Sequence, residues 1–173
     1  MIRMAVDQDT KALTFLRISV GVLFLIFGEY KVFGSQFTLG GGFQHWIHRF
    51  LDDGAYPFMV PILRGLVLPH GTAIAFLVAY GEMAIGLSLV LGLLVRAASV
   101  CGCLYMLALL FSSNDPGPHA EPWQYFGASL DHLVLAFCFV AFMIGRAGKT
   151  WSVSAWASRE SRADRGGGPE MGR

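Results

Sequence analysis

Residues 71–99 read GTAIAFLVAYGEMAIGLSLVLGLLVRAAS, and between Thr72 and Val95 the only charged side chain is Glu82. About 20 apolar residues are enough to cross a bilayer, so this stretch predicts a membrane-spanning helix that continues almost to Arg96. A carboxylate at the centre of such a helix costs roughly 2–3 kcal/mol or more. Glu82 is therefore expected to have a partner, to be protonated, or to have a functional role.

The composition of the whole chain agrees with a membrane protein. Of its 173 residues, 54% are hydrophobic and 14% are charged, and no polar stretch is long enough to fold as a separate soluble domain. A net charge of +1, with no basic cluster interleaved with aromatic residues, gives no support for nucleic-acid binding. The three cysteines lie in apolar segments, and we expect them to be buried structural thiols and not a redox pair or metal ligands.

The predicted fold class is all-α. Four apolar segments are predicted to be helices: 13–33, 72–95, 97–113 and 126–145. Together they predict a membrane-embedded four-helix bundle with a long outer loop, residues 34–70, between helices 1 and 2. The predicted domains are a cytoplasmic N-terminus over 1–12, a membrane domain over 13–156, and a disordered cytoplasmic tail over 157–173.

Basic residues predict the orientation of the bundle. Ten of the 13 Lys and Arg residues lie in the N-terminal segment, at the Arg96 turn or in the C-terminal tail, whereas only Lys31, Arg49 and Arg64 lie on the other side. Because loops rich in Lys and Arg stay in the cytoplasm, both termini are predicted to be cytoplasmic.

Small residues indicate which helix faces meet, since lipid provides no hydrophobic force between helices. The expected seams are Ala75, Ala79, Glu82 and Gly86 in the second helix; Arg17, Gly21, Gly28 and Lys31 in the first; and Gly127, Asp131, Val134, Cys138, Ala141 and Gly145 in the fourth. The ionisable groups expected to converge in the outer half of the bundle are Glu29, Lys31, Glu82, Asp131 and His132. Arg17 lies nearer the cytoplasm and is expected to reach a carbonyl or to extend to the interface.

Two patterns carry a resemblance to a known family. Residues 16–31 follow the pattern LR-x3-G-x2-FL-x2-G-x2-K, and residues 82–98 follow E-x3-GL-x-L-x-LGL-x2-RAA. In these residues the chain resembles the DoxX/DoxD-like membrane proteins from Leu13 to about Trp156. The resemblance implies a four-helix protein of the bacterial or archaeal cytoplasmic membrane, associated with redox systems such as thiosulfate:quinone oxidoreductase.

The candidate site residues have two open interpretations. Glu82, Asp131 and His132 are candidate proton-handling groups near a quinone, because burial favours the neutral form of a carboxyl group. Arg17, Glu29 and Lys31 are candidates for a headgroup-binding or ion-pair cluster. In the structural interpretation, Glu82 bonds helix 4 to fix the packing, and Lys31 either extends to the membrane interface or pairs with Glu29.

Residues 43–53, FQHWIHRFLDD, predict an amphipathic helix outside the bundle. Its polar face carries His45, His48 and Asp52, a spacing that could bind zinc or copper but that is also common on a solvated interface helix. We adopt the interface interpretation and predict no metal site.

The function expected from these features is a quinone-interacting or redox-associated membrane subunit. The main alternative is a non-catalytic membrane scaffold or assembly factor for a redox or stress complex, and a small-solute carrier is a third. No motif for a covalently bound cofactor is present, so quinone is the one candidate cofactor. Expected partners are the lipid bilayer, a redox partner subunit and a second copy of the chain.

Overall fold

The computed structural model of the chain describes residues 2–127, 129–145 and 147. Over these residues every regular element is helical, which confirms the all-α prediction. The predicted disordered tail, 157–173, lies outside the described residues.

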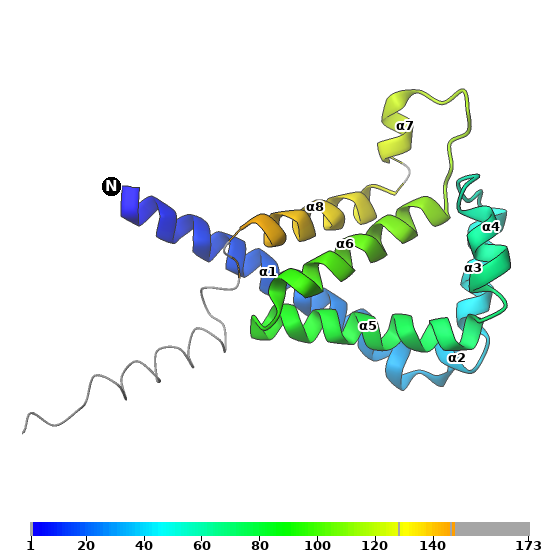
Figure 1. The fold of residues 1–173 in the computed structure, drawn as a ribbon, viewed down its shortest axis with the longest axis horizontal. Helices are drawn as coiled ribbons and strands as arrows, with labels where there is room; N and C mark the ends of the chain where they lie inside the picture. Colours follow the sequence, from blue (N-terminus) through cyan, green and yellow to red (C-terminus); the bar gives the residue numbers. More distant parts are fainter. Residues whose placement is uncertain (1, 128, 146, 148–173) are drawn as a thin grey trace, which may run out of the picture.

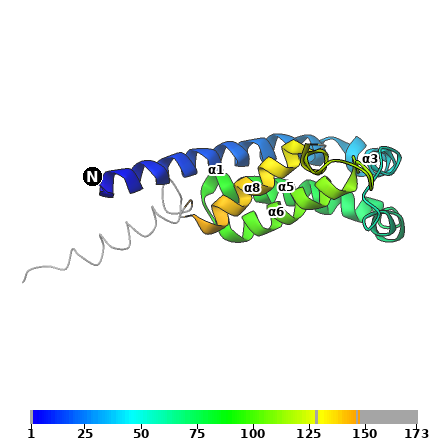
Figure 2. The same cartoon turned by 90° about the horizontal axis from the view of Figure 1, so that it is seen from above.

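Four long helices lie side by side and form the body of the molecule (Figures 1 and 2). They are α1 (Ile2–Phe33), α5 (Gly71–Leu91), α6 (Val95–Ser112) and α8 (Leu130–Ile144). Helix α1 packs along α5 and α6 packs along α8, while α5 contacts α6 and α1 contacts α8. The N-terminal part of α1 extends beyond the other three helices (Figure 1).

Three helical stretches are long and apolar enough to cross a membrane: Gln8–Phe33, Gly71–Leu91 and Val95–Ser112. Helix α8 is also apolar but has 15 residues. It is therefore about 22 Å long, less than the roughly 30 Å of a bilayer core. The fold is an all-α membrane-type fold, and the fourth span stays a prediction.

The outward faces of these helices carry large apolar side chains. Phe15 and Ile26 on α1, Leu77 on α5, Leu104 on α6 and Phe137 on α8 are all exposed in the isolated chain. Such a surface is costly in water and suits contact with lipid chains.

The second and third bundle helices form a tight hairpin. Helix α5 ends at Leu91, and the next residue, Gly92, has a left-handed φ of 71° and bonds the carbonyl of Ser88 through its N–H. Glycine adopts this conformation at little cost, so the helix ends here and not at the predicted Val95. Helix α6 begins at Val95, and Arg96 is exposed in its first turn.

The seams predicted on the first two bundle helices are buried. Ala75 and Ala79 have no exposed surface, and Gly28 lies against the backbone of Met83. A Cβ at position 28 would lie 2.9 Å from the Met83 nitrogen, so only glycine permits this approach of α1 to α5.

The seam predicted on α8 is wrong at Asp131 and Val134, whereas Cys138 packs against the core and Gly145 packs against Leu13. Val134 is 49% exposed and Asp131 is exposed, whereas Ala136, Phe139 and Phe142 form the buried face. The reason is that the small residue at this helix contact lies on α6, and α8 contributes the large side chain. Gly102 of α6 leaves space for the ring of Phe139, which a Cβ at position 102 would overlap.

The connection between α1 and α5 was predicted to be a long loop, but it is mostly helical. It contains α2 (Ser35–Thr38), α3 (Gly42–Asp52) and α4 (Val60–Ile62), which continues into a π-helical turn, η1 (Leu63–Val67). We call residues 34–70 the cap, because they cover one end of the bundle (Figure 1).

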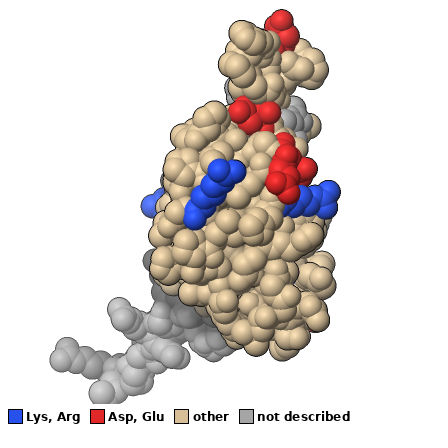
Figure 3. All heavy atoms as spheres, turned by 90° about the vertical axis from the view of Figure 1, so that its right-hand side faces the viewer, with Lys and Arg blue, Asp and Glu red and all other residues tan. Residues whose placement is uncertain are grey.

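The cap has its own apolar core, built from Phe37, Phe43, Ile47, Ala55 and Leu63, which packs on Ala75 and Ala79 of α5. The amphipathic prediction for α3 is confirmed, since Phe43 and Ile47 are buried and His45 and His48 are exposed. Burial of this apolar face explains why the connection is folded. Seen from this end, the surface is mostly uncharged, with a few acidic and basic side chains (Figure 3).

The cap is fixed to the last turn of α6 and to the loop that follows it. The Tyr56 N–H bonds the Phe111 carbonyl at 3.1 Å, and the Asp115 N–H bonds the Gly54 carbonyl at 2.7 Å. Burial, followed by the charges of Asp115 and Tyr125, raises the pKa of the Tyr56 hydroxyl. Helix α7 (Pro122–Gly127) then leads to α8.

The close approach of α1 to α5 can be tested with alanine at Gly28. Gly28→Ala should destabilise the protein, because its Cβ meets backbone that cannot rotate away; overpacking of this kind costs about 1–3 kcal/mol. Thermal unfolding of the purified protein in detergent measures the effect. Gly81→Ala is the matched control on α5, because a Cβ there has nothing within 4 Å. Equal melting temperatures for the two variants would contradict the packing described.

Candidate functional site

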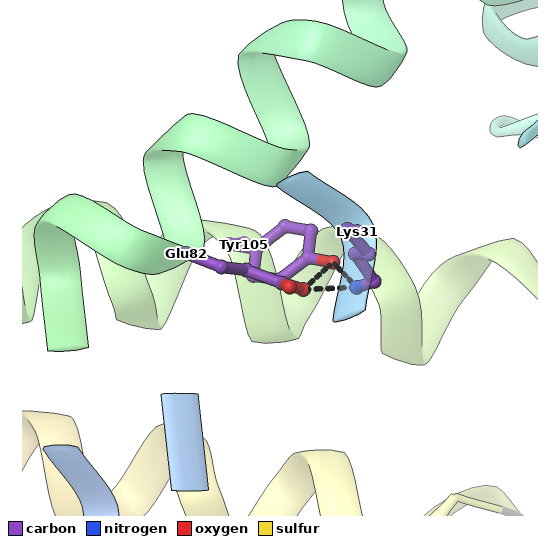
Figure 4. A network of polar contacts seen from close by, with 3 residues as sticks. All are labelled: Lys31, Glu82 and Tyr105. Carbon is purple, nitrogen blue, oxygen red and sulfur yellow. Dashed lines mark hydrogen bonds and ion pairs between the residues drawn. The ribbon is translucent and has the colours of Figure 1, made fainter. Parts of the chain in front are cut away.

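Three polar side chains from three long helices meet inside the bundle (Figure 4). Lys31 comes from the last turn of α1, Glu82 from the middle of α5 and Tyr105 from the middle of α6. The Lys31 ammonium forms an ion pair with Oε1 of Glu82. The Tyr105 hydroxyl donates to the same oxygen at 2.5 Å, and Lys31 Nζ lies 3.5 Å from that hydroxyl. We call these residues the polar triad.

The polar triad is shielded from the surroundings. The side chain of Glu82 is 6% exposed and that of Lys31 is 17% exposed. Lys31 Nζ also lies 5.2 Å from the ring centre of Phe37 in the cap, a cation–π distance. Pairing offsets the large cost of placing either charge alone in a membrane interior.

A cavity of about 280 Å³ lies beside the polar triad. All four long helices contribute to its lining, which consists of Phe24, Phe27, Lys31, Glu82, Tyr105, Met106, Leu109, Asp131, His132 and Leu135. Most of this wall is apolar, and its polar groups are those of the triad and the start of α8. Phe27 is 59% exposed, so the cavity reaches the surface beside it.

Asp131 and His132 form the polar part of the α8 wall. Nδ1 of His132 lies 3.2 Å from Oδ1 of Asp131, which is an ion-pair distance, although the geometry is not that of a hydrogen bond. The side chain of Asp131 is 75% exposed and that of His132 is largely covered. Asp131 therefore lies at the cavity opening and His132 further inside.

A family model described as DoxX matches residues 12–115. The chain belongs to the DoxX family. No curated protein and no solved structure matches it. The matched region includes the whole polar triad, whereas Asp131 and His132 lie beyond it. Together with its apolar helices, this membership identifies the chain as a multi-pass DoxX membrane protein.

Glu82 in this DoxX protein does not bond the helix that the structural interpretation of the sequence predicted. Glu82 bonds α1 and α6 through Lys31 and Tyr105, and not the fourth bundle helix. Lys31 pairs with Glu82 instead of Glu29, which is exposed on the other side of α1. The expected convergence therefore holds for Lys31, Glu82, Asp131 and His132, which all line the cavity, but not for Glu29.

Arg17 lies apart from this cavity. It has no exposed surface, and its guanidinium donates to the carbonyl of Ala147 at 2.7 Å. The buried Thr14 hydroxyl lies 3.5 Å from the same carbonyl. Arg17 was expected either to reach a carbonyl or to extend to the membrane interface, and in the structure it reaches a carbonyl. It does not bring Arg17, Glu29 and Lys31 together.

Sequence reasoning missed Tyr105. Its position along the helix could have indicated a buried role. Tyrosines of spanning helices concentrate at the membrane interfaces, where the hydroxyl reaches water. Tyr105 lies instead in the middle of α6. A buried hydroxyl at that depth requires a hydrogen-bond partner within the protein, which here is Glu82.

The three cysteines are free thiols, but none of them is fully buried, in contrast to the expectation from the sequence. Cys101 is exposed on α6, and Cys103 and Cys138 are half-buried. Within the described part of the chain, His, Cys, Asp and Glu form no group of three or more that could hold a metal ion.

The buried ion pair predicts a large and asymmetric response to mutation. Lys31→Met should destabilise the protein by roughly 3–5 kcal/mol, because Glu82 would remain buried without its cation. Lys31→Met/Glu82→Gln should recover most of this loss, since the amide is neutral and its oxygen still accepts from Tyr105. Equilibrium unfolding in mixed detergent micelles measures both variants.

The control is the exposed pair of Arg49 and Asp53, whose side chains are 58% and 48% exposed at an N–O distance of 3.5 Å. Arg49→Met should change the stability by less than about 1 kcal/mol. A Lys31→Met effect no larger than that of Arg49→Met would show that the polar triad does not stabilise the bundle.

Proposed function

We propose that this DoxX protein is a quinone-interacting subunit of a redox-associated membrane complex, with the quinone ring held in the cavity beside the polar triad. The observation that carries the proposal is the composition of this cavity: buried polar groups at one end and apolar walls that reach the lipid-facing surface. Ligand sites of this kind are mostly apolar with a few convergent polar groups. Binding from the membrane suits a ligand with a polar ring and an apolar tail.

The size of the cavity supports burial of the quinone ring alone, with the tail outside. The volume of about 280 Å³ is near the lower end for ligand pockets. Phe24 and Phe27 would pack against the ring, and the exposed side of Phe27 would lead the tail into the bilayer.

The polar lining supports proton exchange at this position. A quinone supplies two-electron chemistry that is coupled to uptake or release of protons. In the proposal Glu82 exchanges a proton with the bound ring, and His132 and Asp131 pass it to the cavity opening. Lys31 and Tyr105 hold Glu82 in place. Electrons enter or leave through a partner subunit.

The proposed location is the cytoplasmic membrane of a bacterium or archaeon, with both termini in the cytoplasm. The distribution of Lys and Arg supports this orientation. The cavity would then lie in the outer half of the membrane, below the cap.

Ligand titration of the purified protein in lipid nanodiscs tests the proposal. Decylubiquinone, offered in its oxidised and reduced forms, should bind saturably in at least one form. Glu82→Gln and Tyr105→Phe should weaken that binding by about tenfold, because the first removes the buried charge and the second removes the buried hydroxyl from the site. Isothermal titration calorimetry gives the dissociation constants.

Glu29→Gln is the matched control, because it neutralises an exposed carboxylate two residues from Lys31 without touching the cavity. It should leave the dissociation constant unchanged. Absence of saturable binding in either redox form would exclude the quinone role.

The alternative function is a non-catalytic scaffold for a redox or stress complex. One observation favours it: the polar triad joins α1, α5 and α6, so it could act solely as a clamp between helices. In that case Glu82→Gln would leave the function of the assembled complex intact, and Glu82→Leu would disturb folding or assembly. Affinity purification of both variants, with the recovered partner quantified, distinguishes the two functions.

A further inference from the structure

The hydrogen-bonding capacity of the polar triad is used unevenly. The Lys31 ammonium is directed to Oε1 of Glu82 and the Tyr105 hydroxyl, and it also faces the Phe37 ring. The Tyr105 proton is donated to the same Oε1. Two of the three Lys31 donors and the single Tyr105 donor are therefore engaged within the triad, and one hydrogen bond from each residue ends on the same oxygen of the carboxylate.

The second carboxylate oxygen of Glu82, Oε2, receives no hydrogen bond from the described residues, although it is buried. The whole residue is 5% exposed, and it lines the cavity. A buried carboxylate oxygen without a donor is costly, and a membrane interior provides little water to replace that donor. What the cavity lacks on this wall is a hydrogen-bond donor.

We infer that the cavity selects the reduced, hydroxyl-bearing form of its ligand, a hydroquinone that donates an O–H to Oε2 of Glu82. This inference rests on the proposed quinone function and specifies the redox form that the site prefers. The oxygens of an oxidised quinone are carbonyls, which only accept hydrogen bonds. They cannot satisfy Oε2 while Lys31 keeps the carboxylate ionised, whereas each hydroxyl of a hydroquinone can.

The position of His132 is consistent with this preference. Its Nδ1 is buried on the α8 wall of the cavity, near Asp131, in a geometry that does not make a hydrogen bond. In the tautomer that leaves Nδ1 without a proton, this nitrogen accepts a hydrogen bond, so the α8 wall then offers a second acceptor to a ligand with two hydroxyl groups.

Three ligands that share one ring and one tail test the inference on the unmodified protein. They are decylubiquinol kept reduced under argon, decylubiquinone, and the bis-O-methyl ether of decylubiquinol, which has no hydroxyl proton and does not oxidise. In nanodiscs, decylubiquinol should bind about tenfold more tightly than either of the others, as expected for a hydrogen bond to a charged group. Isothermal titration calorimetry measures the three dissociation constants.

Glu82→Gln should reduce the preference for the quinol over its ether to about threefold or less, because the charged acceptor is lost. Glu29→Gln should leave the preference unchanged. If Glu82→Gln does not fold, the comparison of the three ligands on the unmodified protein still decides the question.

The outcomes separate this inference from the proposed function. Equal binding of quinol and ether, or tighter binding of the quinone, would overturn the inference while the quinone role stands. A preference that persists in Glu82→Gln would also overturn it, because Oε2 would not be its origin. No saturable binding of any of the three ligands would overturn both.

Discussion

The buried contact between the Lys31 ammonium and the Glu82 carboxylate is the constraint on which the rest of the bundle depends. Neither charge is tolerable alone in a membrane interior, so the end of α1 must stay next to the middle of α5. A hydrogen-bonded contact between the two groups requires an N–O distance of about 3 Å, and the helices must therefore approach closely. Gly28 permits this approach directly beside Glu82, and Gly86 lies against the Gly21 carbonyl one to two turns away.

The same packing explains why a cavity lies beside the ion pair. Helices α1 and α8 are held together at one end, where Arg17 bonds the Ala147 carbonyl and Gly145 packs against Leu13. Toward the other end of α1, the space between them is lined by side chains, among them Phe27 and Asp131, instead of being filled by them. A pair of helices fastened at one end leaves an opening at the other. This geometry combines a rigid polar wall on α5 with access from the lipid side.

The sequence predicted the helices better than the contacts between them. Apolar length located the four bundle helices, because the cost of exposed backbone in lipid leaves few alternatives to a helix. The spacing of Ala75, Ala79 and Glu82 located the buried face of α5. The rule that small residues mark a seam failed on α8, since Phe139 packs on a glycine of its partner. Tyr105 and the parts of the cap other than α3 were missed for a related reason: their roles depend on residues far away in the chain.

The two oxygens of Glu82 argue for different roles. An ion pair that served only to join helices would gain most from donors at both oxygens, because an unsatisfied buried oxygen reduces the stabilisation that the pair provides. Here Lys31 and Tyr105 both bond Oε1, and within the described residues the buried Oε2 has no donor. The bonds to Oε1 hold the carboxylate in position, and Oε2 remains an open acceptor on a residue that lines the cavity. Such an arrangement costs stability and is the form expected of a site that completes its hydrogen bonding with a ligand.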